Sequence, residues 1–355
     1  MIDFRYHLVS IVAVFLALAI GIVLGSTELQ GPAYNILNST TGKLQNELGQ
    51  VSTQRDAAQQ QAALGQNYAQ AVEPVVLHDL LAGQRLLIIT EPGAPASVVT
   101  AISNAATQDA GATVTGQIAL QPKFFDRSDT TLDGLNQVTL AMSQADNIVL
   151  NTGTPYQQQA AQVIASEILT QAPAASAGHA GGQPSTGVSA GSQQDTNAQT
   201  MLGAYANEGF LTTSGQPSTP ATLAVIVTPQ TAPQDGSADL LDQLLVPVAE
   251  ELAAKSSATV VAGVSAGSGP GSPIAVLRAS SAATKVSTVD DADFVAGQSV
   301  VIQALAMQLN GGAPGSYGFA NGASAVGPSP APTPTPSSSP SPSASTTPTS
   351  KKPKK

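Results

Sequence analysis

The chain has no cysteine among its 355 residues, so it can form no disulfide bond and offers no thiolate ligand to a metal ion. An exported protein can lack disulfides, so this absence does not argue against a location outside the cytoplasm. Tryptophan is also absent, and aromatic residues make up only 4% of the sequence. A transmembrane β-barrel needs aromatic girdles and many alternating segments, so the composition argues against a barrel built from this chain alone.

Basic residues are scarce as well. There are 13 Lys and Arg against 23 Asp and Glu, which gives a formal net charge of −10. Four of the 13 basic residues lie in the last five positions, so the rest of the chain is still more acidic. Nucleic acid and anionic membrane surfaces attract basic proteins. We therefore expect no nucleic-acid partner for the folded part.

Long apolar runs are missing from all but one stretch of the sequence. Residues 8–24 are uncharged, and as a helix they would extend about 26 Å, close to the thickness of the hydrocarbon core of a bilayer. The alternative, a cleaved signal peptide, needs a basic leading segment and a small-residue cleavage site, which are poorly represented here. We predict an uncut anchor in the lipid bilayer, represented by Leu8, Phe15, Gly21, Leu24 and Gly25.

The flanking charges predict the orientation of this anchor. Arg5 and the terminal amine precede the apolar run, and Glu28 is the first charge beyond it. By the positive-inside rule, the N-terminus lies in the cytoplasm and residues 26–355 lie outside it, in the cell envelope. Gly21 and Gly25 have the spacing that lets two membrane helices pack closely, although glycine is also simply common in such helices.

The sequence from residue 31 to residue 80 predicts a coiled-coil stalk. Gly31-Pro32 is expected to break the helix, after which apolar residues recur with 4–3 spacing, and Pro74 is expected to end or kink this segment. A single helix packed on its own domain is the alternative. In a coiled coil the chain would form a homo-oligomer. The large side chains of the predicted seam are Leu37, Leu44, Leu48 and Val51.

Residues 84–320 predict an α/β domain with a mainly parallel sheet covered by helices, because strand and helix patterns alternate. The predicted strands are 85–90, 112–118, 147–151, 223–228, 259–264 and 274–277. The predicted helices are 98–109 with Ser97 as its cap, 130–145, 157–170, 198–207, 237–254 with a kink or break at Pro247, and 293–309. Within this domain, residues 172–196 lack periodicity and predict a flexible loop.

Both ends of the chain have their own predicted character. Residues 1–30 form the cytoplasmic flank and the anchor, ahead of the stalk. Residues 321–355 are rich in Pro, Ser and Thr and end in lysines, so they cannot bury a core and predict a disordered tail.

Residues able to bind a metal ion are scattered. His7, His78 and His179 are far apart in the sequence, and the four methionines form no cluster suited to copper. Direct copper binding is therefore doubtful, and we predict no metal ligand. Three carboxylates precede the last predicted helix, where the helix dipole favours them more than a metal site does: Asp290, Asp291 and Asp293.

Signatures of catalysis and of cofactor binding are weak. The loop 267–271 is rich in glycine, but it lacks the spacing of a dinucleotide fingerprint and precedes a predicted strand, so we interpret it as a plain loop. An anion site at the turn Glu91-Pro92-Gly93 has no support from a phosphate-loop Lys-Ser/Thr. No Gly-x-Ser-x-Gly motif marks a nucleophile. We expect no enzyme activity and no cofactor.

Two blocks of sequence resemble an actinobacterial family typified by mycobacterial copper transport protein B. The N-terminal block is Ile2-Asp3-Phe4-Arg5-Tyr6-His7, followed by Leu8-Val9-Ser10 and the segment 13–25. The C-terminal block is Ser287-Thr288-Val289-Asp290, Ala296-Gly297, Ala304-Leu305 and Gly315-Ser316-Tyr317-Gly318.

The resemblance covers about residues 1–320 and implies a function. It implies a membrane-anchored envelope protein with a role in copper efflux across the outer envelope, as a pore. A coiled-coil role in cell-wall assembly and division has been proposed for relatives, which implies an envelope or division protein as partner. The resemblance supplies no ligand residues.

Overall fold

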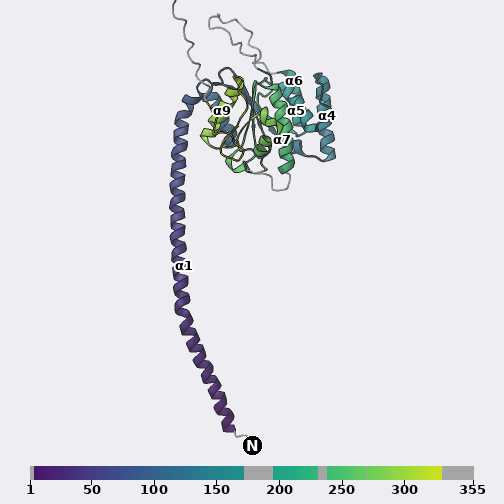
Figure 1. Cartoon of the computed structure of the whole chain (residues 1–355). Coiled ribbons are helices and arrows are strands. Elements are labelled where there is room, and N and C mark those ends of the chain that lie inside the picture. The colour runs from purple at the N-terminus through teal and green to yellow at the C-terminus, as the bar shows by residue number, and fades with distance from the viewer. Residues whose placement is uncertain (1–3, 172–194, 231–237, 270, 330–355) are drawn as a thin grey trace, which may run out of the picture. The chain divides into compact units, whose positions relative to one another are not determined.

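The computed structural model describes the backbone of residues 4–171, 195–230, 238–269 and 271–329. Contacts divide the chain into two compact units, Met1–Pro74 and Val75–Lys355. Most of helix α1 (Phe4–Leu77) makes up the described part of the first unit, and an α/β domain makes up that of the second (Figure 1). The predicted tail from residue 330 onward lies outside the described residues, as do residues 172–194 of the predicted loop.

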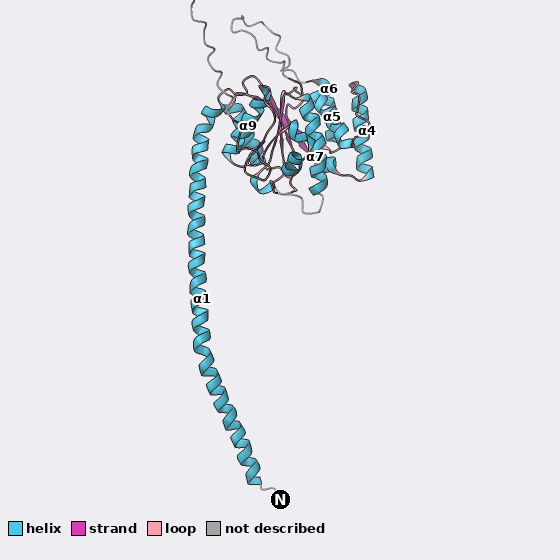
Figure 2. Ribbon diagram, viewed as in Figure 1, coloured by secondary structure: helices cyan, strands magenta, loops and turns pink. Residues whose placement is uncertain are grey.

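Helix α1 is one continuous helix of 74 residues, drawn as an unbroken, gently curved ribbon in Figure 2. The predicted break at Gly31-Pro32 was therefore wrong. A proline removes one backbone hydrogen bond and crowds the preceding turn, which bends a helix more readily than it ends one when strong helix formers lie on both sides. The helix likewise passes Pro74 and ends at Leu77, which is buried in the core of the α/β unit.

The described part of the α/β unit contains a seven-stranded sheet with the order β3-β2-β1-β4-β5-β6-β7. All neighbouring strands are parallel except β3, which pairs antiparallel with β2 at one edge. The mixed α/β class and the mainly parallel sheet are thus confirmed. The strands are β1 Arg85–Thr90, β2 Thr113–Leu120, β3 Leu211–Gly215, β4 Leu223–Val227, β5 Ala258–Ala262, β6 Ser287–Val289 and β7 Ser316–Tyr317.

Helices cover both faces of this sheet, and each face has its own hydrophobic core. One face is covered by α2, α9 and the buried end of α1, the other by α3 to α8, and Figure 1 shows α9 on one side and α4 to α7 on the other. The helices are α2 Ala96–Asn104, α3 Pro122–Phe125, α4 Asp129–Ala145, α5 Tyr156–Ile168, α6 Thr196–Asn207, α7 Ala238–Lys255, α8 Pro273–Ala279 and α9 Val295–Leu309.

Four local predictions were wrong. Residues 274–277 lie in α8 and not in a strand, because Ser272 caps a helix there and Pro273 opens it. Residues 147–151 form no strand, although Ile148 and Leu150 pack against the core. Helix α2 begins before Ser97, with Pro95 as its N-cap, and of the kink or break predicted at Pro247 the break is wrong, because α7 runs through that residue.

Candidate functional site

The first candidate site is the apolar part of α1. Arg5–Gly25 is a stretch of 21 residues with a mean hydropathy of 2.9, and none of it is buried inside the protein. It is the single helix in the described residues that is long and apolar enough to cross a membrane. Leu8, Phe15 and Leu24 are each more than half exposed. Gly21 and Gly25 have no neighbouring atom near the place a Cβ would occupy, so their surface is open to another helix.

The predicted seam lies further along α1 and is also exposed. The exposed fractions are 66% for Leu37, 53% for Leu44, 68% for Leu48 and 62% for Val51. Each of these side chains would gain about 1.5–3 kcal/mol if another surface removed it fully from water. Arg55, the charged seam position that follows, is paired with Asp56 at 2.7 Å. The large apolar side chains of the 4–3 stripe thus lie on the exposed surface of the helix.

Metal-binding groups do not gather in the described structure. Among the described residues, no group of three or more His, Cys, Asp or Glu side chains is placed to hold a metal ion. His78 Nδ1 lies 3.2 Å from Asp79 Oδ2 on the surface, and His179 lies outside the described residues.

A buried ion pair organises the C-terminal part of the sheet. Arg278 Nη2 lies 2.8 Å from Asp290 Oδ2, and the two side chains are 5% and 2% exposed. Asp290 also accepts hydrogen bonds from the backbone N–H groups of Phe319 at 2.8 Å and Ala320 at 3.1 Å. Arg278 in turn donates to the carbonyl oxygen of Tyr317 at 2.7 Å. The pair therefore fastens the chain after β7 to the end of β6.

The Arg278–Asp290 ion pair and its main-chain hydrogen bonds are called the clasp below. The sequence blocks that carry the C-terminal resemblance come together at this clasp. Asp290 follows β6, Gly297 opens α9, and Gly318 follows β7. A Cβ on Gly318 would overlap the Asp290 carboxylate, and the φ of Gly318 is +119°. A Cβ on Gly297 would overlap the main chain of Asp291. Both positions therefore require glycine, because another part of the chain approaches the backbone too closely for a Cβ atom. The sequence blocks of the resemblance thus correspond to a structural junction.

Asp291 is the unusual carboxyl group of this region. Its side chain is 1% exposed, and Oδ1 has no hydrogen-bond partner within the described residues. Burial, and next the negative charge of Asp290, raise the pKa of Asp291 from its ordinary value of 3.8 to about 6. This carboxyl group therefore favours the protonated form more than an ordinary aspartate does.

Two of the three carboxylates that precede α9 have hydrogen-bond partners elsewhere in the fold. The N-cap residue of α9 is Phe294, which provides no side-chain cap. Asp290 is held by the clasp, and Asp293 Oδ1 accepts hydrogen bonds from the backbone N–H and the hydroxyl of Ser265, at 2.9 and 2.8 Å. Both carboxylates are thus held by tertiary partners as well as lying before the N-terminus of α9.

The glycine-rich loop was also interpreted partly wrongly. It follows β5 as predicted, but a helix follows it and not a strand. Gly267 lies against the carbonyl oxygens of Pro229 and Gln230, so a close approach of two backbone segments requires that glycine. Glu91, at the end of β1, is 5% exposed and thus lies inside the protein, not at an open anion site.

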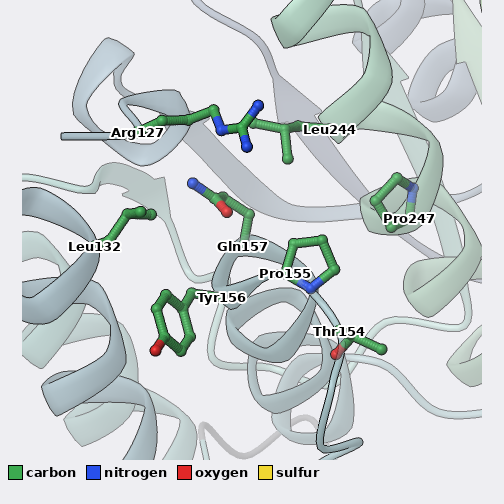
Figure 3. A pocket seen from close by; sticks show the side chains of 8 residues that line it. All are labelled: Arg127, Leu132, Thr154, Pro155, Tyr156, Gln157, Leu244 and Pro247. Carbon is green, nitrogen blue, oxygen red and sulfur yellow. The ribbon is translucent and has the colours of Figure 1, made fainter. Parts of the chain in front are cut away.

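Sequence reasoning missed a cavity of about 380 Å³ in the α/β unit, shown in Figure 3. It lies between the loop before α4, the start of α5 and the first half of α7. The advance signal in the sequence was Pro155, which lies beside Thr154 just before a predicted helix. The side chains that line it are Arg127, Leu132, Thr154, Pro155, Tyr156, Gln157, Leu244 and Pro247.

These features define a class: a protein whose described residues contain one membrane-length helix, followed along the chain by an α/β unit. Residues 1–328 match the family described as "Copper transport outer membrane protein, MctB". The chain belongs to this family, which confirms the resemblance drawn from its two sequence blocks.

The similarity to named relatives extends over nearly the whole length of the chain. The chain is 30% identical to "Copper transporter MctB" of Mycobacterium tuberculosis (strain ATCC 25618 / H37Rv) over 331 residues, which cover 92% of this chain and 99% of the relative. The proteins of the same name from Mycobacterium bovis and Mycobacterium leprae are 30% and 29% identical, with the same coverage.

Proposed function

We propose that the protein acts in copper homeostasis at the cell envelope as a single-span membrane protein. The observation that carries this proposal is the family match across residues 1–328, which includes both the apolar helix and the α/β unit. The relatives in the comparison are named as copper transporters, and the chain matches them over almost their full length.

The proposed topology places Arg5–Gly25 in the bilayer, the N-terminus in the cytoplasm and the α/β unit outside. Complete exposure of this apolar segment supports it, because such a surface in water would cost far more than it does in lipid. Arg5 at the leading end supports the orientation.

A pore made by this protein would require several chains. A single α-helix satisfies its own backbone and has no lumen, so an ion path needs helices arranged around a common axis. The exposed seam on α1 and the open glycine face at Gly21 and Gly25 supply surfaces for such an assembly. We therefore propose that copper efflux depends on a homo-oligomer, and that the chain acts without a copper-binding cluster of its own.

The second candidate function is an envelope scaffold for cell-wall assembly or division. The exposed 4–3 stripe favours it, because a long helix with one apolar seam suits a mechanical or spacing role as well as a pore. A scaffold would hold an envelope or division protein at the membrane.

Copper sensitivity of a deletion strain separates the two functions. Under the first proposal, loss of the gene lowers the copper concentration that stops growth, and the full chain restores tolerance. A strain with normal copper tolerance but altered cell shape or wall staining would contradict copper homeostasis and support the scaffold. Complementation with Leu48→Asp, against Gln45→Asp as the matched control beside the seam, then tests whether oligomers are needed.

A further inference from the structure

The cavity of Figure 3 has one charged wall and several apolar ones. Arg127 lies on one side, and its guanidinium group is directed across the opening toward Leu244. Gln157 also lines the cavity, is only 2% exposed, and donates from its amide to the carbonyl oxygen of Asp126 at 3.5 Å. Leu132, Pro155 and Pro247 complete the apolar lining.

The acid next to Arg127 in sequence is already engaged elsewhere. Asp126 accepts hydrogen bonds from the backbone N–H of Ser128 and from the hydroxyls of Ser128 and Thr131, each at 2.9 Å. The backbone bond, followed by the two hydroxyls, lowers the pKa of Asp126. Glu251, one turn beyond Pro247 on α7, accepts from the Gln158 amide at 2.8 Å. Within the described part of the chain, Arg127 forms no ion pair.

The start of α5 adds to the positive character of the cavity. Tyr156 and Gln157 are its first two residues, and Pro155 at the N-cap position provides no side-chain cap. The N–H groups of the first turn carry partial positive charge, which favours a negative group beside them. The N-terminus of α5 and the Arg127 guanidinium group thus both contribute positive potential to the cavity.

We propose that this cavity binds a carboxylate carried on a small apolar group. A guanidinium group matches a carboxylate through two parallel hydrogen bonds, and Arg127 brings such a group to the lining of the cavity. The apolar walls fit a hydrocarbon portion, and the volume is within the range of small-molecule sites. A phosphate is a poorer fit because only one cationic side chain lines the cavity. The carboxylate can come from a free organic acid or from the last residue of a peptide.

The test uses the full chain in bilayer nanodiscs, titrated by calorimetry with N-acetyl-leucine and with its uncharged match, N-acetyl-leucinamide. The acid is expected to bind about tenfold more tightly than the amide, because a charge-assisted hydrogen bond to the Arg127 guanidinium group is lost in the amide. Hexanoate forms the second arm. Equal binding of hexanoate identifies free organic acids as the ligands, and binding of N-acetyl-leucine alone identifies peptide C-termini.

Arg127→Gln is expected to abolish the preference for the acid over the amide. Lys255→Gln removes an exposed positive charge at the far end of α7 and serves as the matched control, with binding unchanged. Circular dichroism establishes that both variants fold. Absence of carboxylate-dependent binding at millimolar concentrations, or an equal effect of both variants, would overturn the proposal, and neither result bears on copper tolerance.

Discussion

Arg278 and Asp290 form an ion pair inside the α/β unit, with 2.8 Å between Nη2 and Oδ2. Both partners have further hydrogen bonds to main-chain atoms of residues 317–321, so the pair connects β6 to the segment after β7. An ion pair of this kind is costly to break, because each charge would be left buried without its partner.

Arg278→Met is expected to lower the free energy of unfolding by about 3 kcal/mol, since it leaves the Asp290 carboxylate buried and uncompensated. Denaturant unfolding of the full chain in nanodiscs, followed by circular dichroism, measures this change. Lys285→Met is the control, because the Lys285–Glu250 bridge at 3.3 Å has a lysine that is half exposed, and its loss should cost less than about 1 kcal/mol. Similar losses in both variants would contradict the assigned role of the clasp.

Gly318→Ala should destabilise the protein by about 2–4 kcal/mol, because the new Cβ would both occupy a strained φ and overlap the Asp290 carboxylate. Gly203→Ala is the matched control inside α6, where no atom lies near the added Cβ. That change should stabilise the protein by up to about 1 kcal/mol, since alanine is the better helix former. The two variants are thus expected to shift the melting temperature in opposite directions.

Asp291 predicts a pH dependence of stability. Its pKa in the folded protein is about 6, above the ordinary value of 3.8, so folding favours the protonated form. Stability from this group is therefore full below about pH 4 and is lost as the pH rises through 6. Asp291→Asn should accordingly be more stable than the native protein by about 2 kcal/mol at pH 7 and nearly equal to it at pH 4. A difference in unfolding free energy that does not change with pH would refute this assignment.

Leu48→Asp is expected to weaken the proposed homo-oligomer, because it places a charge in the seam of α1. Single cysteines at Leu44 and Gln45 test the seam directly in membranes, since the native chain has no cysteine. Disulfide-linked dimers should form at position 44 and not at position 45. Equal yields at the two positions, or none at either, would indicate that the stripe packs against another protein.

The anchor proposal predicts that the mature protein keeps Met1 or Ile2 as its first residue and stays with membranes in high salt. Phe15→Arg should reduce the membrane-bound fraction, because an arginine near the centre of a bilayer costs about 2.5–3.5 kcal/mol. Leu64→Arg, on an exposed position of α1 outside the apolar stretch, should leave it unchanged. A mature N-terminus near Ser26 or Thr27 would show that the segment is removed.

The sequence predicted those elements whose burial is strong and local. Strand β1 has the predicted bounds because five of its six residues are buried, which makes it a continuous apolar run. The strands it missed, β3, β6 and β7, are short, and β3 is an exposed edge strand of Thr, Ser and Gly after its first residue. Their pairing depends on distant partners and leaves little trace in a local pattern.

Two apolar segments, residues 147–151 and 274–277, were wrongly predicted to be strands because their local sequence pattern is strand-like. Val149 is 85% exposed between the half-buried Ile148 and Leu150, so the alternation is real, yet no strand pairs with it. In α8, the capping hydroxyl of Ser272 accepts from the backbone N–H of Ala275 at 3.2 Å, and this cap outweighs the strand-like composition of Ile274 and Val276. The sites were harder still, because the clasp and the cavity each join residues that are far apart in the chain.

The two faces of the sheet differ in the order in which their parts leave the ribosome. The core under α9 contains Leu77 and Leu81 from the start of the unit, and Val301 and Tyr317 from its end. More than two hundred residues separate these two groups. Contacts across such distances in sequence form slowly. During synthesis, this face of β5 therefore stays uncovered until α9 is made, and a chain truncated before α9 would expose Val260 and Ala262 to aggregation or proteolysis.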